Sequence, residues 1–478
     1  MKKSTRYFPS NPRRTFLRSA AALTAMTLLP GCDQTKSDPQ SPVVFTPGKP
    51  LPWINWAGNQ TCTPTARLAP ASEDQLVSML KNAKGIVRAV GASHSFSGVV
   101  PSNDTLISTD LLSGVISHDA ASVQADIWAG TRMHALGPML AAIDQALPNQ
   151  PDMDYPAMGG AIACCAHATG KDFGSMSSYV VGLTLATPSG ELIECSRSQH
   201  PEIFQAARTS IGALGVISRL KLQNHRAFRL VETNRVEKTD DVLDAFAERC
   251  AQHRHFEFLA LPHTSLCASV TTDIASDTDQ PSGEEDNNAA HTLRKVYNAL
   301  SWLPGIGDAA YEKVLTMALG GAGKEIRVGP SYEVFPHVRV VRFREMEYTV
   351  PAEHGPACLR EILHTIRSKK IPVCFPLEFR LVKADDIWLS MFEGRDGVAI
   401  SVHQFGDLDY KPYFAQIEPI FWKYQGRPHW GKIHTLGAQQ LAALYPHHWQ
   451  DFQEVRRQLD PEGRMLNDHL KNLFGVTS

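Results

Sequence analysis

Short apolar runs alternate with stretches of helical periodicity along residues 53–225. Apolar runs of strand length predict β-strands at residues 86–90, 105–108, 123–129, 180–187, 191–195 and 218–222. Residues 73–81 follow Ser72, a good N-cap, and predict a helix, as does the apolar spacing of residues 132–147. This mixture predicts an α+β domain over residues 53–225.

A second α+β domain is predicted over residues 226–478. Its strands are expected at residues 231–236, 330–346, 371–382 and 398–405, and its helices at 240–250, 413–424 and 445–459. Residues 272–288 are acidic and polar with little apolar content, which is typical of a surface excursion or a disordered segment. We therefore expect a flexible insertion over residues 272–325.

The first 32 residues read as a targeting signal. Arg13 and Arg14 precede an apolar stretch, residues 19–29, that is too short to span a bilayer comfortably. The arginine pair and this stretch together resemble a twin-arginine export signal. The stretch ends in Leu29-Pro30-Gly31-Cys32, which resembles a lipobox, and the sequence leaves lipidation of Cys32, and with it a membrane anchor, open. Residues 33–52 read as a polar linker. The expected location is periplasmic or otherwise extracytoplasmic, and export in the folded state favours an enzyme that carries a cofactor.

Charge and motif spacing exclude several classes of function. The formal net charge is −2 and no basic stripe is present, so no nucleic-acid partner is expected. The nine cysteines show no zinc spacing, and the neighbours Cys164 and Cys165 point to opposite faces if they lie on a strand, so no metal site is expected. No G-x-G-x-x-G follows a predicted strand, which argues against a dinucleotide site of the Rossmann type.

Two segments of small residues favour a cofactor site. Gly91-Ala92-Ser93-His94-Ser95 follows the predicted strand 86–90, and small side chains allow phosphates to approach backbone N–H groups. A histidine bonded in an ordinary turn is the plainer reading of His94. The second segment, residues 159–170, combines paired glycines with His167, Thr169 and Gly170, and paired glycines allow a chain to approach a bound group closely.

Four polar residues in the second domain are candidate functional residues. Glu378 and Arg380 lie two residues apart on a predicted strand and therefore share a face, although a structural salt bridge is the plainer reading. Lys432 follows His429 and Trp430, and His403 lies on the strand after the Glu378 segment.

Together these segments resemble the FAD-linked aldonolactone and alditol oxidases of the vanillyl-alcohol-oxidase flavoprotein superfamily. The resemblance also includes Ala384-Asp385-Asp386-Ile387-Trp388-Leu389-Ser390 and covers the chain from about residue 55 to its end, apart from residues 272–322. It implies a two-domain fold with a PCMH-type FAD-binding domain and a C-terminal substrate, or cap, domain. It also implies FAD bonded covalently to His94. The positions that it places at the cofactor are Gly91, Ala92, Ser93, His94, Ser95, Gly160, His167, Thr169, Gly170, Gly174, Ser177, Val181, Gly182 and Ile217.

The resemblance further implies the reaction. A CH–OH group of a polyol or aldonolactone would pass a hydride to flavin N5, with Glu378, Arg380 and Lys432 orienting the hydroxyls and His403 completing the pocket. Ala168 replaces a glycine usual in the family. The sequence leaves the electron acceptor open. It is either O₂ or another electron carrier, and with the second the enzyme is a dehydrogenase. A non-catalytic sugar-binding lipoprotein is the alternative from a different class. The substrate's identity and the oligomeric state are not decided by the sequence.

Overall fold

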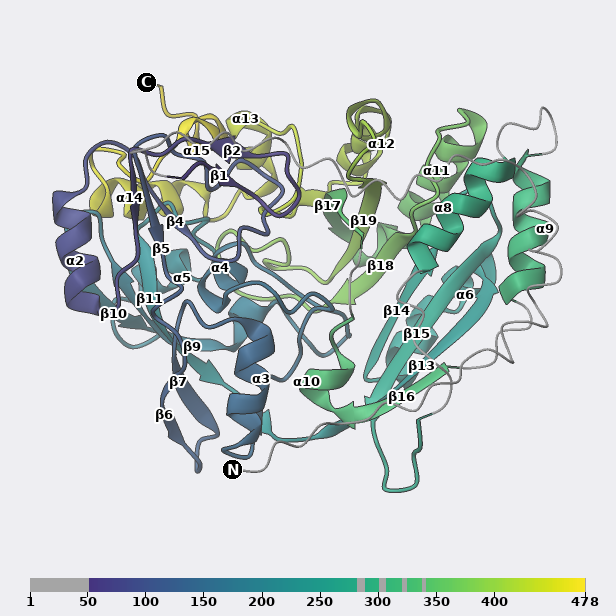
Figure 1. The fold of residues 1–478 in the computed structure, drawn as a ribbon, viewed down its shortest axis with the longest axis horizontal. Coiled ribbons are helices and arrows are strands. Elements are labelled where there is room, and N and C mark those ends of the chain that lie inside the picture. Colours follow the sequence, from purple (N-terminus) through teal and green to yellow (C-terminus); the bar gives the residue numbers. More distant parts are fainter. Residues whose placement is uncertain (1–50, 282–288, 301–306, 320–324, 338–340, 478) are drawn as a thin grey trace.

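A computed structural model describes residues 51–281, 289–300, 307–319, 325–337 and 341–477. The predicted export signal, the lipobox and most of the linker lie outside these ranges. Within them, every helix is too short or too polar to cross a bilayer. In Figure 1 the molecule has two halves side by side, with several small sheets in one half and a large sheet in the other.

The first half contains a parallel sheet, an antiparallel sheet and covering helices. The parallel sheet has the order β3-β5-β4, formed by Ala66–Leu68, Thr105–Ser108 and Val87–Val90. The antiparallel sheet has the order β10-β9-β11-β7-β6, formed by Leu192–Ser196, Val180–Ala186, Val216–Gln223, Gln124–Trp128 and Val115–Asp119. The helices are α2 (Glu73–Asn82), α3 (Met133–Ala141), α4 (Met158–Ala163), α5 (Pro201–Ala207) and the 3-10 turn η1 (Met176–Tyr179). Two-stranded pairs complete this half: β1 (Trp53–Ile54) with β2 (Thr61–Cys62), and β8 (Gln145–Ala146) with β12 (His225–Arg226).

The second half is built on an eight-stranded antiparallel sheet. Its order is β16-β13-β15-β14-β18-β19-β17-β20, formed by Glu325–Pro330, Arg229–Lys238, Leu266–Ile274, His255–Ala260, Leu377–Val382, Gly397–Phe405, Phe343–Pro351 and Arg427–Pro428. The accompanying helices are α6 (Thr239–Asp244), α7 (Phe246–Gln252), α10 (Ser331–Val334), η2 (Ala352–His354), α11 (Gly355–Ser368) and α12 (Lys411–Lys423). One apolar cluster runs through both halves and includes Phe96 of the first and Trp430 of the second.

Most predicted elements of the first half are confirmed. Helix α2 begins after Ser72, whose side chain accepts a hydrogen bond from the Gln75 backbone N–H, as predicted. The predicted helix 132–147 is too long. Helix α3 ends at Ala141, because Asp144 takes a left-handed conformation with φ of 57° and the chain then enters β8.

Prolines explain the main errors in the second half. The predicted strand 330–346 is wrong: β16 ends at Pro330, α10 follows, and β17 begins only at Phe343. The predicted strand 371–382 begins at Leu377, after Pro372 and Pro376, since a proline has no N–H to donate to a sheet. The predicted helix 240–250 is two helices, α6 and α7, that share Ala245 as a cap.

Two further expectations about the second domain are corrected. The predicted flexible insertion 272–325 contains two helices, α8 (Ala289–Leu300) and α9 (Gly307–Leu319), which contribute Val296, Tyr311 and Leu315 to a buried cluster with Leu261. The predicted helix 445–459 begins at Trp449, because Pro446 disfavours a helical residue before it.

The C-terminal helices also pack on the first half, although the predicted boundary at residue 226 assigned them to the second. Helices α13 (Ala438–Leu444), α14 (Trp449–Leu459) and α15 (Asp468–Phe474) lie above the first half in Figure 1. The Asn467 side chain donates hydrogen bonds to the carbonyl oxygens of Gly98 and Pro101, at 2.8 and 2.9 Å. The chain therefore crosses to the second half and returns.

Arg88 joins this returning segment to the loops around it. The side chain is 2% exposed and donates to the carbonyl oxygens of Val99, Ile211 and Gly212 at 2.7–2.8 Å, and also to that of Met465. A guanidinium group has five N–H donors in a fixed plane, which lets one side chain hold several backbone segments at once. Arg88 thus fixes three separate parts of the chain around the end of β4.

Candidate active site

A cavity lies between the two halves. Its first wall comes from the loop after β4, from residues 151–167 and from residues 210–217. Its second wall comes from the large sheet, through residues of β17, β18 and β19 and of the segment that follows β20. The cavity therefore brings together the two groups of residues that the sequence singled out.

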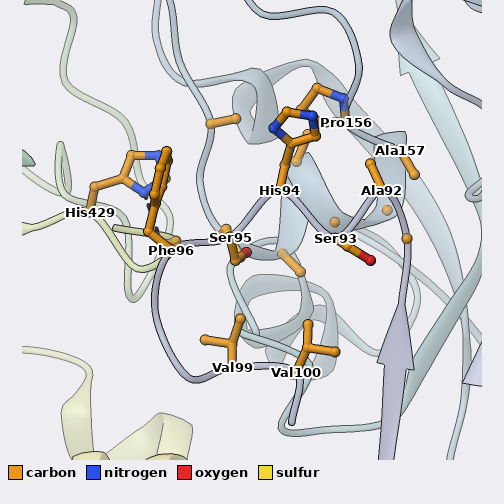
Figure 2. A pocket seen from close by; sticks show the side chains of 18 of the residues that line it. Ala92, Ser93, His94, Ser95, Phe96, Val99, Val100, Pro156, Ala157 and His429 are labelled. Atoms are coloured by element: carbon orange, nitrogen blue, oxygen red, sulfur yellow. Dashed lines mark hydrogen bonds between the residues drawn. The ribbon is translucent and has the colours of Figure 1, made fainter. Parts of the chain in front are cut away.

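The loop after β4 is held in a defined shape. The Trp53 indole donates to the Ser93 hydroxyl at 2.9 Å, and the Ser93 carbonyl accepts from the Trp56 backbone N–H at 2.8 Å. Ser93 itself has φ of 60°, a left-handed conformation. Figure 2 shows Ala92 to Phe96 along one side of the cavity, with Pro156 and Ala157 on the neighbouring segment.

The His94 ring lies between two aromatic rings and is neutral. It stacks on Trp56 at 5.1 Å and on Tyr155 at 5.7 Å between ring centroids. Burial lowers the pKa of His94 to about 4, and the positive charges of Lys432 and Arg132 act in the same direction. At neutral pH the imidazole therefore keeps the lone pair that a nucleophile needs.

The predicted cofactor positions fall into two groups. Those that line the cavity are Gly91, Ala92, Ser93, His94, Ser95, Gly160, His167 and Ile217. Those that do not line it are Thr169, Gly170, Gly174, Ser177, Val181 and Gly182. Members of the second group have structural contacts: the Thr169 hydroxyl donates to the Phe256 carbonyl and the Ser177 hydroxyl to that of Ile162, at 2.8 and 2.9 Å. Val181 and Gly182 belong to β9.

The opposite wall is one face of the large sheet and carries a dense set of charged side chains. Glu345 on β17 is paired in register with His403 on β19. Ser401 on β19 is paired with both Glu347 of β17 and Glu378 of β18. Since residues two apart on a strand share a face, all of these side chains project from the same side of the sheet.

Arg380 is surrounded by three carboxylates. Its Nε atom donates to Glu257 at 2.7 Å, and its Nη2 atom lies 2.8 Å from Glu378 and 3.4 Å from Asp152. Burial lowers the pKa of Arg380, but these carboxylates outweigh it and leave the pKa well above the ordinary value. The predicted pairing of Glu378 and Arg380 on one face is confirmed, and Asp152 ties this pair to the first half.

Lys432 and His403 share a second carboxylate. The Lys432 ammonium group donates to Glu345, and Nε2 of His403 lies 3.6 Å from the other oxygen of that carboxylate. Nδ1 of His403 donates to the Pro376 carbonyl at 2.9 Å. Burial alone would raise the pKa of Glu345, yet Lys432 and His403 hold it at about 2, so the carboxylate is ionised inside the protein.

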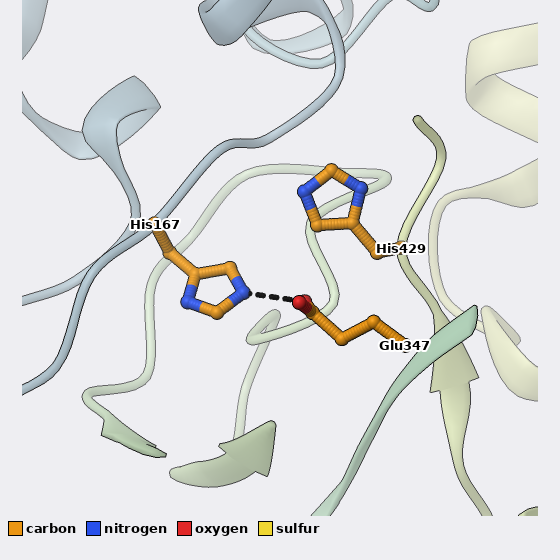
Figure 3. Close-up of side chains that lie close together, drawn as sticks. All are labelled: His167, Glu347 and His429. Atoms are coloured by element: carbon orange, nitrogen blue, oxygen red, sulfur yellow. Dashed lines mark hydrogen bonds and ion pairs between the residues drawn. The ribbon is translucent and has the colours of Figure 1, made fainter. Parts of the chain in front are cut away.

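A third group connects the halves through Glu347. Figure 3 shows His167 from the first half facing this carboxylate, with a distance of 2.7 Å between Nε2 and Oε1. Nδ1 of His167 donates to the Ala168 carbonyl at 3.0 Å, and the Ser401 hydroxyl donates to Glu347 at 2.7 Å. His429 completes the group and accepts from the Gly431 backbone N–H through Nδ1 at 3.0 Å. His167 therefore faces the sheet's charges as well as the cavity.

Sequence reasoning missed four polar residues of this site, Asp152, Glu257, Glu345 and Glu347, and named His429 only as a neighbour of Lys432. A signal existed for Glu345 and Glu347, whose spacing of two places both carboxylates on one face of a strand. The predicted strand ended at residue 346 and so separated them. Glu257 and Asp152 carry no local signal, because Arg380, their partner, is more than 120 residues away.

Comparison with known proteins gives two family models and many relatives. The model described as D-arabinono-1,4-lactone oxidase matches residues 220–473, and that described as FAD binding domain matches residues 64–196. The L-gulono-1,4-lactone dehydrogenase of Mycobacterium tuberculosis is 33% identical, over 88% of this chain and 99% of that protein. The L-gulonolactone oxidase of Bos taurus and the alditol oxidase of a Streptomyces species are each 28% identical, over 89% and 88% of this chain and 99% and 98% of theirs.

Solved structures show the same fold. The cholesterol oxidase of Brevibacterium sterolicum is similar with a TM-score of 0.72 and 17% sequence identity, over 91% of this chain and 100% of that one. At that identity the similarity concerns the fold alone.

Acidification is expected to destabilise the protein through its buried histidines. Burial lowers the pKa to about 4 for His255, His429 and His469 and to about 3 for His434. Below pH 6.5 these histidines are protonated in the unfolded chain but stay neutral in the folded protein. The free energy of unfolding therefore falls as the pH falls from 6.5 towards 4. The pKa values of His403 and His337 are raised, so these two groups increase the stability as the pH falls. They are fewer than the histidines whose pKa is lowered.

The measurement is the thermal midpoint at pH 7 and at pH 5, which we expect to be lower by several degrees at pH 5. His469→Gln should reduce the difference in thermal midpoint between the two pH values. His118→Gln, at an exposed histidine, should show the same difference as the wild type. Equal midpoints at the two pH values would contradict this account.

Proposed function

The chain belongs to the FAD-dependent aldonolactone oxidase family, and on that premise we propose that it oxidises a CH–OH group of an aldonolactone or a sugar alcohol. It is an oxidoreductase of the vanillyl-alcohol-oxidase fold. The observation that carries the proposal is that Glu378, Arg380 and Lys432 line the same cavity as the His94 loop.

The residues of the first wall fit FAD. Among the described residues, no protein acceptor bonds the backbone N–H groups of Ala92, Ser93, His94 and Ser95, which border the cavity. Consecutive backbone donors that are left without a protein acceptor suit a diphosphate. A Cβ atom added at Gly160 would meet no atom within 4 Å, so this part of the wall leaves room for a flat ring.

The sheet wall supplies substrate binding and fixed charge. When bound, FAD supplies the two-electron acceptor for the hydride of the CH–OH carbon. Arg380 and Glu378 offer donors and an acceptor to neighbouring substrate hydroxyls, and their mutual contact keeps both oriented. Burial lowers the pKa of Lys432, but Glu345 and Glu347 outweigh it and keep the ammonium group charged. Lys432 thus gives the cavity a fixed positive charge, which would stabilise negative charge that develops next to it.

We also propose that His94 holds FAD covalently, with the neutral imidazole as nucleophile. The expected result is that acid-precipitated protein stays yellow and that a proteolytic peptide containing His94 carries the mass of the flavin. His94→Ala should still bind FAD but release all of it on acid treatment. Full release of flavin from the wild type would contradict the linkage and leave the rest of the proposal intact.

The roles of the charged residues are separable by anaerobic stopped-flow measurement of flavin reduction. Loss of a charge-assisted hydrogen bond to substrate costs about 2–5 kcal/mol. We therefore expect Glu378→Gln and Arg380→Met to lower kcat/KM by roughly 30-fold to several thousand-fold, with little change in the flavin spectrum. Lys432→Met should instead slow reduction and lower the flavin potential. If Glu378→Gln and Arg380→Met react as fast as the wild type, the pair is only a structural salt bridge.

The substrate class is tested with a panel of aldonolactones and alditols, each assayed with O₂ and with an artificial electron acceptor. Turnover in both conditions indicates an oxidase, and turnover with the artificial acceptor alone indicates a dehydrogenase. A protein that contains FAD but oxidises no member of the panel would contradict the proposed substrate class.

The proposal extends to export through the twin-arginine route with FAD already bound. It rests on Arg13 and Arg14 and on the apolar stretch that follows them. Replacing both arginines by lysine should keep the precursor in the cytoplasm, as judged by immunoblots of cell fractions. Normal periplasmic levels of the double variant would reject this route. A membrane anchor through Cys32 is tested by the same fractions, in which Cys32→Ala should move the protein from the membrane to the soluble fraction.

A further inference from the structure

The polar face of the large sheet continues beyond the candidate active site. Arg380 on β18 is paired in register with Glu257 on β14, and the next residue of β14 on this face is His255. His255 is paired with Thr272 of β15, which is paired with Glu232 of β13. In Figure 1 these strands follow one another away from β18 towards β16. A polar stripe therefore runs from the site across the sheet in one direction.

A second pocket of about 30 Å³ lies on this stripe. It shares Asp152 and Arg380 with the larger cavity, so the two spaces adjoin at that ion pair. A volume of this size holds one hydroxyl group on its carbon or about two water molecules. Its walls include Asn149 and Gln150 from the first half and His255 and Glu257 from the sheet.

His255 is a buried acceptor without a partner. Its Nδ1 atom donates to the Thr169 carbonyl at 2.8 Å, while Nε2 is buried and has no hydrogen-bond partner among the described residues. The side chain is 3% exposed, and burial lowers its pKa to about 4, so that the ring is neutral and Nε2 carries a lone pair. A buried polar atom of this kind requires a donor.

Packing fixes the His255 ring. It stacks on Phe173 at 4.8 Å and meets Phe335 edge-on at 5.2 Å between ring centroids. The unpartnered nitrogen therefore has a defined direction before any ligand arrives, which favours selective recognition.

The pocket is also lined by a second residue with an unpartnered imidazole nitrogen. Nδ1 of His337 is buried without a partner among the described residues, while its Nε2 atom lies 3.1 Å from Glu232 and 2.8 Å from Arg327. A ligand here meets polar groups on two sides. A hydroxyl group, which both donates and accepts, matches this environment better than an apolar group or an anion, because Glu232 and Glu257 also border the space.

We propose that this pocket binds the hydroxyl group at the end of the substrate remote from the reacting carbon, with His255 as the acceptor that recognises it. This inference rests on the proposed function, because it takes the substrate to be a polyhydroxylated chain or lactone tail. Such a molecule is held at its reacting end by Glu378 and Arg380 of β18 and extends along the stripe. It reaches β14 within a short distance, because neighbouring strands of a sheet lie about 5 Å apart. The pocket therefore selects substrates by the presence of a terminal hydroxyl.

The test compares a substrate found in the panel with its terminal-deoxy analogue, in the wild type and in His255→Leu. A site built to bond a hydroxyl rejects the analogue that lacks it. We expect the wild type to prefer the hydroxylated substrate by about 10- to 100-fold in kcat/KM, the range for one unsatisfied buried partner. In His255→Leu the preference should fall to within about threefold. The ratio cancels the cost of losing the Thr169 bond, since both substrates meet the same variant.

His253→Leu is the matched control. This residue lies two positions earlier, is part-exposed and is bonded to Asp273 away from the pocket, so the preference should stay as in the wild type. His255→Gln keeps an acceptor and should retain part of the preference, and it also serves if the leucine variant does not fold. Flavin absorbance and the thermal midpoint check the fold of each variant.

A wild-type preference near one, or an equal preference in the wild type and in both His255 variants, would overturn the inference and leave the pocket with water only. Either result would leave the proposed function standing, since the substrate is still oxidised. Failure of every lactone and alditol in the panel would instead contradict the proposed function and this inference with it.

Discussion

Buried charge at the contact between the two halves is the constraint on which the rest of this structure depends. Glu345, Glu347, Glu378 and Arg380 lie on one sheet face and are each no more than 8% exposed. A charge in such a place is tolerated only when it is paired and hydrogen-bonded. Two of the pairings cross between halves, through Asp152 with Arg380 and His167 with Glu347. The cavity therefore has its shape only when both halves are in place.

The same constraint explains why so many charges are kept in a site that uses few of them. Removing one partner of a buried pair leaves the other uncompensated, at about 3–5 kcal/mol. Lys432 needs Glu345, which also faces His403, and Arg380 needs three carboxylates. The fold itself does not demand this set. The cholesterol oxidase fold is similar at 17% identity, and a fold is compatible with many activities, so the activity depends on the site.

Local structure could be predicted from the sequence, and long-range pairing could not. The Ser72 cap, the His94 loop after β4 and the shared face of Glu378 and Arg380 each depend on neighbours in the chain, and each prediction agrees with the structure. Glu257 and Asp152 are brought to Arg380 by the order of strands in the sheet and by the contact between halves, which no local pattern encodes. The six predicted cofactor positions that lie off the cavity share the local glycine and serine pattern of those that line it, so sequence spacing alone could not separate them.

The return of the chain to the first half has a consequence for biosynthesis. Arg88, beside the His94 loop, donates to the carbonyl of Met465, and Asn467 bonds the segment just after that loop. Each of these contacts joins residues more than 360 positions apart, so they form only after residues 465–467 have been synthesised. The first half cannot mature during translation ahead of the second, although it comes first in the chain. A nascent chain that is stopped before residue 465 has every residue that lines the cavity, yet lacks the Met465 and Asn467 contacts on either side of the loop, so the site is completed only after both halves have been synthesised.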